Sequence, residues 1–158
     1  VSFGFGQEKT RKQLIKERKI EKVRQTTILI DSKEFVFVGK KAFPLGYGNI
    51  DLTTNPNYIE FKPDFIRSEM PFFGRGYSGI GYGGYSGLKF EGKPSEFTIV
   101  KGKKSYEIKA TVKGEQDVFT IFMSVLFEGS ATLTISSNNR STISYNGEIF
   151  KIEKKGDK

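Results

Sequence analysis

The sequence predicts a mainly β protein: a single antiparallel β-sandwich or barrel-like domain of about ten strands, preceded by an N-terminal α-helix. Short runs of β-branched and aromatic residues recur about every 8–12 residues and end at turn-forming residues. No helical spacing separates these runs, so consecutive strands are expected to pair antiparallel. A chain of 158 residues is ordinarily one domain.

Residues 7–31 predict the helix, because the segment has no Gly or Pro and is rich in Lys, Glu, Arg and Gln. Its first half is nearly all charged and is expected to project from the fold. Its second half carries a stripe at helical spacing that could dock on a sheet: Ile20, Val23, Thr27 and Ile30. The run 28–30 could instead belong to a strand.

The net charge of +8 is concentrated at the two ends of the chain. Residues 8–24 hold eight Lys or Arg and three Glu, and the C-terminal residues 151–158 hold four Lys, one Glu and one Asp. The body between them is nearly neutral. Runs of charged residues usually lie on solvent-exposed faces, so the net positive charge alone does not indicate a nucleic-acid partner.

The expected strands follow in order over residues 34–43, 49–54, 58–62, 65–70, 88–91, 97–100, 106–113, 118–127, 131–136 and 142–152. Residues 106–113 alternate strictly, which places Tyr106, Ile108, Ala110 and Val112 on the core side. Residues 118–127 carry apolar side chains at both odd and even positions, which point to opposite faces of a strand. We therefore expect a central strand covered on both faces, with Phe122 in a core.

Residues 71–90 provide the candidate binding site. Seven of the 18 glycines lie between Gly74 and Gly87, with tyrosines interleaved among them. Glycine permits unusual backbone conformations, and tyrosine offers flat apolar area with a polar tip. The segment is either a binding surface or a structural plug. The candidate ligand- or partner-binding residues are Arg75, which could grip a carboxylate or phosphate, and Tyr77, Tyr82 and Tyr85.

Several chemistries are excluded. Gly74–Gly79 matches G-x-G-x-x-G, but a dinucleotide site requires a following helix, and here more glycine and then a strand follow. The absence of Cys and His removes disulfides, Cys or His zinc sites and Ser-His or Cys-His catalysis. No cofactor or metal is expected. A carboxylate-dependent enzyme and nucleic-acid binding through the basic helix remain alternatives.

Residues 1–6 are interpreted as the end of a signal peptide. Gly4 and Gly6 stand at the −3 and −1 positions of a small-x-small cleavage site, which would leave Gln7 first in the mature chain. No apolar stretch reaches the length of about 20 residues that a membrane-spanning helix requires.

Seven sequence motifs follow one another along the chain: SKEFVF at 32–37, AFPLG at 42–46, NIDLT at 49–53, PFFGR at 71–75, LKFEGKP at 88–94, ISSNNR at 135–140 and ISYNGEI at 143–149. After a charged leader, this order resembles the DUF4251 family of Bacteroidota over most of residues 33–152. The resemblance implies export and a bacterial envelope protein, without an established activity or catalytic residues to carry over.

The resulting expectation is a non-catalytic periplasmic or secreted binding or interaction module. Its partner would be an envelope protein, a peptide or a glycan, with no nucleic acid and no transmembrane segment. The expected organisation is a signal-peptide remnant at 1–6, a charged helix at 7–31, a β domain at 33–152 and a basic tail at 153–158.

Overall fold

The structure, a computed structural model, describes residues 10–44, 48–54, 56–71, 88–114, 117–138 and 140–153. Within these residues one helix and ten strands follow in order: α1 (Arg11–Ser32), β1 (Phe35–Pro44), β2 (Ile50–Asp51), β3 (Tyr58–Lys62), β4 (Phe65–Met70), β5 (Leu88–Gly92), β6 (Pro94–Lys101), β7 (Ser105–Lys113), β8 (Val118–Leu126), β9 (Ser130–Ser137) and β10 (Ile143–Phe150). The predicted class, a mainly β domain with an N-terminal helix, is confirmed.

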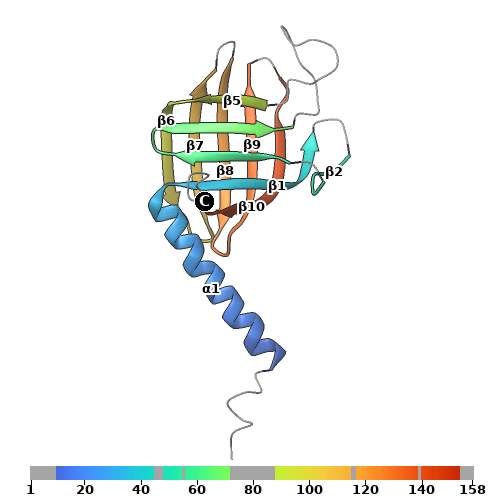
Figure 1. Ribbon diagram of the computed structural model, residues 1–158, viewed down its shortest axis with the longest axis vertical. Coiled ribbons are helices and arrows are strands. Elements are labelled where there is room, and N and C mark those ends of the chain that lie inside the picture. The colour runs from blue at the N-terminus through green and yellow to red at the C-terminus, as the bar shows by residue number, and fades with distance from the viewer. Residues whose placement is uncertain are drawn as a thin grey trace, which may run out of the picture.

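Helix α1 begins at a capping box and is docked only near its end. The Thr10 hydroxyl accepts from the Gln13 amide, and the Gln13 side chain accepts from the Thr10 amide. The helix stops at Lys33, which takes the left-handed conformation at φ 60°. Thr26 and Ile30 are its buried residues. The helix therefore projects from the sheet over most of its length (Figure 1).

The expected docking stripe on α1 is confirmed only in part. Ile30 is 4% exposed, and the hydroxyl of Thr27 lies 3.4 Å from that of Tyr106, whereas Ile20 is 60% exposed. The run 28–30 is helical. Among the described residues, no helix combines the length and apolarity needed to cross a bilayer.

The strands form one antiparallel sheet in the order β5-β4-β3-β1-β10-β9-β8-β7-β6, with β2 paired to β1. The sheet folds over so that β1, β3, β4 and β5 run across β6 to β9 (Figure 1). The end strand β5 also packs against the opposite layer: the rings of Phe90 on β5 and Phe119 on β8 stack with centroids 4.1 Å apart. The arrangement is a flattened, barrel-like fold of two layers.

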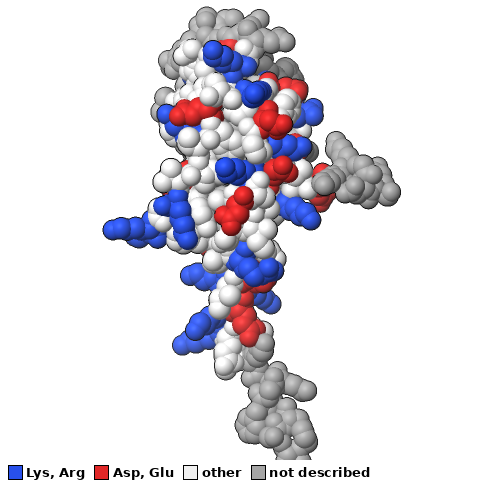
Figure 2. Space-filling model, turned by 90° about the vertical axis from the view of Figure 1, so that its left-hand side faces the viewer, with Lys and Arg blue, Asp and Glu red and all other residues white. Residues whose placement is uncertain are grey.

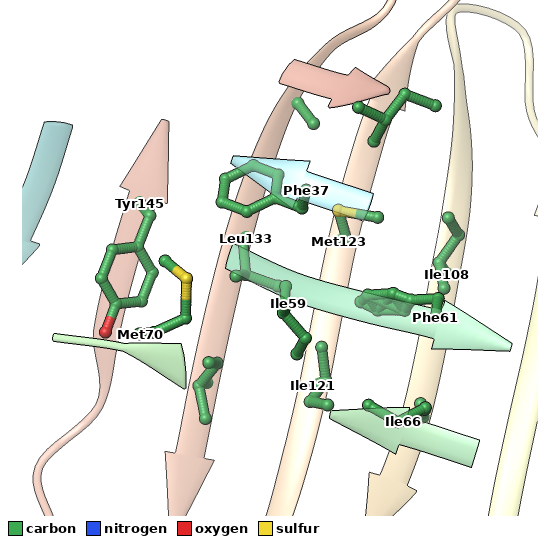
Figure 3. Close-up of a cluster of buried hydrophobic side chains, with 14 of the residues drawn as sticks. Phe37, Ile59, Phe61, Ile66, Met70, Ile108, Ile121, Met123, Leu133 and Tyr145 are labelled. Atoms are coloured by element: carbon green, nitrogen blue, oxygen red, sulfur yellow. The ribbon is translucent and has the colours of Figure 1, made fainter. Parts of the chain in front are cut away.

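The core fills the space between the two layers, as Figure 3 shows. Each side chain at its centre is at most 2% exposed. One layer contributes Phe37, Ile59, Phe61, Ile66 and Met70, and the other contributes Ile108, Ile121, Met123, Leu133 and Tyr145. The burial of this apolar area is the main stabilising contribution to such a fold.

The expected alternation of β7 is confirmed, because Tyr106, Ile108, Ala110 and Val112 are all buried. The expectation that β8 is covered on both faces is wrong. The strand is central, between β7 and β9, but its outward residues Phe122 and Leu126 are each 47% exposed. No described element packs on that face, and Phe122 is covered only in part by Lys109, whose Nζ lies 5.5 Å from the ring centroid.

Candidate functional site

The predicted site residues Arg75, Tyr77, Tyr82 and Tyr85 lie outside the described residues, so their role remains a prediction. The structure does place the two ends of their segment. Met70 and Leu88 are register partners on β4 and β5, and the Ser68 hydroxyl donates to the Leu88 carbonyl at 2.6 Å. The hydroxyl of the buried Tyr145 donates to the Pro71 carbonyl at 2.5 Å. The segment thus leaves and re-enters the sheet at one point.

The described residues form a groove on the outer face of β8, β9, β10 and β1, which we call the outer groove. Its volume is about 480 Å³ and it is open to solvent. This volume lies within the range of about 300–1,000 Å³ found for small-molecule sites. The groove is lined by Lys40, Lys41, Ser124, Leu126, Ser130, Ala131, Thr132, Asn146, Gly147 and Glu148.

Strand register brings the polar lining residues together. Ser124 on β8 is paired with Thr132 on β9, Thr132 with Asn146 on β10, and Asn146 with Lys41 on β1. Successive residues of a strand point to opposite faces, so the residues on either side of Ser124 and Thr132, and Tyr145 before Asn146, are buried in the core. The polar row therefore stands on strands whose other face is packed in the core, which fixes its backbone.

Hydrogen bonds within the protein orient the groove's side chains. Ser124 Oγ donates to Glu107 at 2.6 Å, Thr132 Oγ1 donates to Asn146 Oδ1 at 3.3 Å, and Ser130 Oγ donates to Glu128 at 2.9 Å. Each hydroxyl proton is thereby committed, which leaves the oxygen lone pairs as acceptors. Among the described residues the Asn146 Nδ2 has no partner, so it is a donor available to a ligand.

The groove has an ion pair, and its second lysine lies near a carboxylate. Lys40 forms an ion pair with Glu148, and Lys41 lies opposite Asp51 in the register of β1 and β2. At the far end of the polar row, hydrogen bonds from Ser105 and then Ser124 hold the pKa of Glu107 below its usual range. A carboxyl group with a lowered pKa is ionised at neutral pH and is a poor general acid.

The backbone below the groove has an irregularity that shapes it. The pairing of β1 with β10 shifts between Gly39 and Lys41, and both Lys40 and Lys41 are exposed. A bulge of this kind adds a residue and redirects side chains. Opposite it, a Cβ on Gly147 would lie 2.0 Å from the Val38 carbonyl oxygen. The close approach of the two backbones therefore requires glycine there.

Sequence reasoning missed this groove, although a signal for it is present. Glu148 is the single charged residue at the outward positions of β8, β9 and β10; the others are mostly Ser, Thr and Asn. The outward positions of β3, β4 and β5 are instead mostly charged. A sheet face with one charged residue, in a chain with 28% charged residues, indicates a surface with a different role.

The protein is therefore a small β domain, in which one antiparallel sheet folds over into two layers and a helix precedes it. Within that class, the family model of DUF4251, a domain of unknown function, matches residues 17–149, and the chain belongs to this family. The resemblance drawn from the sequence motifs is confirmed.

A solved structure shares this fold. It is the crystal structure of a DUF4251 family protein from Bacteroides eggerthii DSM 20697, with a TM-score of 0.64 and 16% sequence identity. The match covers 83% of this chain and 88% of that chain. No curated protein matches this chain.

Proposed function

We propose that the protein is an exported, non-catalytic binding module of the bacterial envelope and that the outer groove is its binding site. The observation that carries this proposal is the row of Ser124, Thr132 and Asn146, held in register across three adjacent strands. Small-molecule sites typically place a few oriented polar groups in a concave surface. Placing them on strands rather than on loops keeps their geometry fixed before a ligand arrives.

Binding is favoured over the alternative of a carboxylate-dependent enzyme. Glu148, the one carboxylate among the lining residues, is paired with Lys40. Two further carboxylates accept hydrogen bonds from lining hydroxyls: Glu107, whose pKa is lowered, and Glu128. General acid catalysis by a carboxyl group at neutral pH requires a raised pKa. The described residues also contain no cluster of three or more acidic side chains that could hold a metal ion.

Binding to nucleic acid through α1 is the weaker alternative. Lys and Arg side chains spread over the projecting part of the helix, but acidic side chains stand among them (Figure 2). Arg24 is paired with Glu21. Nucleic-acid affinity depends on many unpaired phosphate contacts, and single strands additionally need exposed aromatic rings beside them. The exposed large hydrophobic residues on the described part of α1 are aliphatic.

The binding role can be tested by NMR titration of the labelled protein with a deproteinised envelope extract. We expect shift changes around Ser124, Thr132 and Asn146, while the component that binds is recovered chemically unchanged. Conversion of a component by the wild-type protein, and its loss in Glu148→Gln, would establish an enzyme instead.

Export is tested separately in the native host. The protein should be found in the periplasm or the medium with Gln7 as its first residue. Gly6→Leu, which places a large side chain at the −1 position, should block processing, whereas the control Ser2→Leu at −5 should be processed normally. A cytoplasmic chain that retains residues 1–6 contradicts export.

A further inference from the structure

We propose that the outer groove binds a neutral glycan. This inference rests on the proposed binding function and names its ligand class. Sugar hydroxyl groups both donate and accept hydrogen bonds, so a site for them must offer both kinds of partner. The groove does so: Ser124 Oγ and Thr132 Oγ1 present lone pairs, and the Asn146 Nδ2 presents two protons.

The polar groups are oriented before any ligand binds. Thr132 is held by Asn146, Ser124 by Glu107 and Ser130 by Glu128. Because Ser and Thr have few rotamers and these hydrogen bonds select one, binding immobilises little additional side-chain freedom. Flexible side chains would lose this advantage, since each one ordered on binding weakens affinity.

The same face supplies apolar contact area for a sugar ring. Leu126 lines the groove, and Phe122 lies outside the lining on the same face of β8, on the other side of Ser124; each is 47% exposed. The face of a pyranose ring presents C–H groups that do not bond to water, and their burial against apolar side chains is favourable. An apolar side chain beside fixed polar groups therefore suits a ligand with both kinds of surface.

The charge arrangement favours a neutral ligand over an anionic one. Lys40 is paired with Glu148, and Lys41 lies opposite Asp51 in the register, close enough for the two charges to interact. A sulfated or uronic-acid ligand would have to compete with these carboxylates. A neutral ligand needs only the remaining protons and lone pairs.

The test is isothermal titration of the full chain with defined neutral oligosaccharides of gluco, manno, galacto and N-acetylated types, beside their sulfated and uronic-acid counterparts. The variant is Thr132→Val, which keeps the side-chain shape and removes the hydroxyl. Thr134→Val is the matched control, because Thr134 lies on the same face of β9 outside the groove lining. Circular dichroism should show both variants folded, since valine suits strands.

We expect a neutral oligosaccharide to bind with a Kd near or below about 1 mM, the weak end of specific binding. Thr132→Val should weaken it by about tenfold, the effect of losing one ligand hydrogen bond, and Thr134→Val by less than about twofold. Affinity for a neutral ligand should not change between low and high salt. Shift changes in an NMR titration should lie around Ser124, Thr132 and Asn146.

Three results would overturn the inference. One is binding of charged glycans alone with affinity that falls as salt rises, since that identifies an anionic ligand. Another is an equal effect of Thr132→Val and Thr134→Val, or shift changes confined to residues 72–87, since either places the ligand elsewhere. The last is no binding of any neutral oligosaccharide at about 1 mM. None of these results bears on export, so the envelope location is judged independently.

Discussion

Replacing Gly147 with alanine tests the close backbone approach that joins the two layers. The added Cβ would lie 2.0 Å from the Val38 carbonyl oxygen, 2.8 Å from the Val38 carbonyl carbon and 2.9 Å from the Gly39 Cα. Ordinary contacts of a Cβ begin at 3.4 Å. All three obstructing atoms belong to the backbone, so no side chain can rotate away and the strands β1 and β10 must separate.

The expected cost follows from this geometry. Overpacking in a well-packed protein costs about 1–3 kcal/mol, and the backbone obstruction places Gly147→Ala at the upper end. Alanine also lowers the conformational entropy of the unfolded chain, which stabilises the folded state by about 0.4–1 kcal/mol. We therefore expect a net loss of about 2–2.6 kcal/mol in the free energy of unfolding. For a chain of this size that is a decrease in Tm of roughly 5–10 °C.

The assay is urea and thermal unfolding followed by circular dichroism, with Gly48→Ala as the control. A Cβ on Gly48 would meet nothing within 4 Å, so this variant should stay within about 0.5 kcal/mol of the wild type or gain slightly. If Gly147→Ala is as stable as Gly48→Ala, the two backbones do not approach as described, and the reasoning about this junction is wrong.

Three further predictions concern stability, each measured by chemical unfolding. Phe119→Ala should cost about 3–5 kcal/mol, because Phe119 is buried. Phe122→Ala should cost less than about 1 kcal/mol, because the Phe122 ring is 47% exposed. Equal costs would mean that the outer face of β8 is covered. Ile30→Ala should cost about 2–4 kcal/mol and Ile20→Ala less than about 0.5 kcal/mol, unless α1 is docked along its whole length. Because the pKa of Glu107 is lowered in the folded protein, its ionised carboxylate stabilises the fold above its unfolded pKa, and this stability is lost as the pH falls through the folded pKa. Glu107→Gln removes this titration, so the free energy of unfolding should fall less steeply at acidic pH than in the wild type. An unchanged slope at acidic pH would contradict this.

The strands were predictable where local signals agree. The segments 58–62 and 65–70 were predicted with the bounds observed for β3 and β4, because Pro63 and Asp64 mark the turn between them. The segment 49–54 was predicted too long. Asp51 accepts hydrogen bonds from both the amide and the hydroxyl of Thr53, and this local turn ends β2 after two residues.

The covering of β8 was not predictable from periodicity. Apolar residues at both parities indicate burial on both faces only when a second layer exists on each side. Here the outer face carries Phe122 and Leu126 without such a layer. The apolar pattern of a strand shows which of its residues could be buried. Which of them are buried depends on whether another layer covers each face of the strand.

The outer groove could not be read from local pattern either. Ser124, Thr132 and Asn146 are separated in the sequence by turns, and only the register of three strands aligns them. The approach of Lys40 to Glu148 also depends on the shift between Gly39 and Lys41. The glycine and tyrosine segment was conspicuous by composition, and its role stays a prediction.

The strand order has a consequence for how the chain folds. Strands β6 to β10 pair with their neighbours in sequence, and β3, β4 and β5 do likewise, so each half can assemble from local contacts. The strand pairing that joins the two halves is β1 with β10, which we call the seam. Its partners are far apart in the sequence, as Phe37 and Ile149 show. Closing so long a loop has a large entropic cost before any contact compensates it. Proteins governed by such distant pairings fold in milliseconds to seconds, and the formation of this seam is the step expected to set the rate.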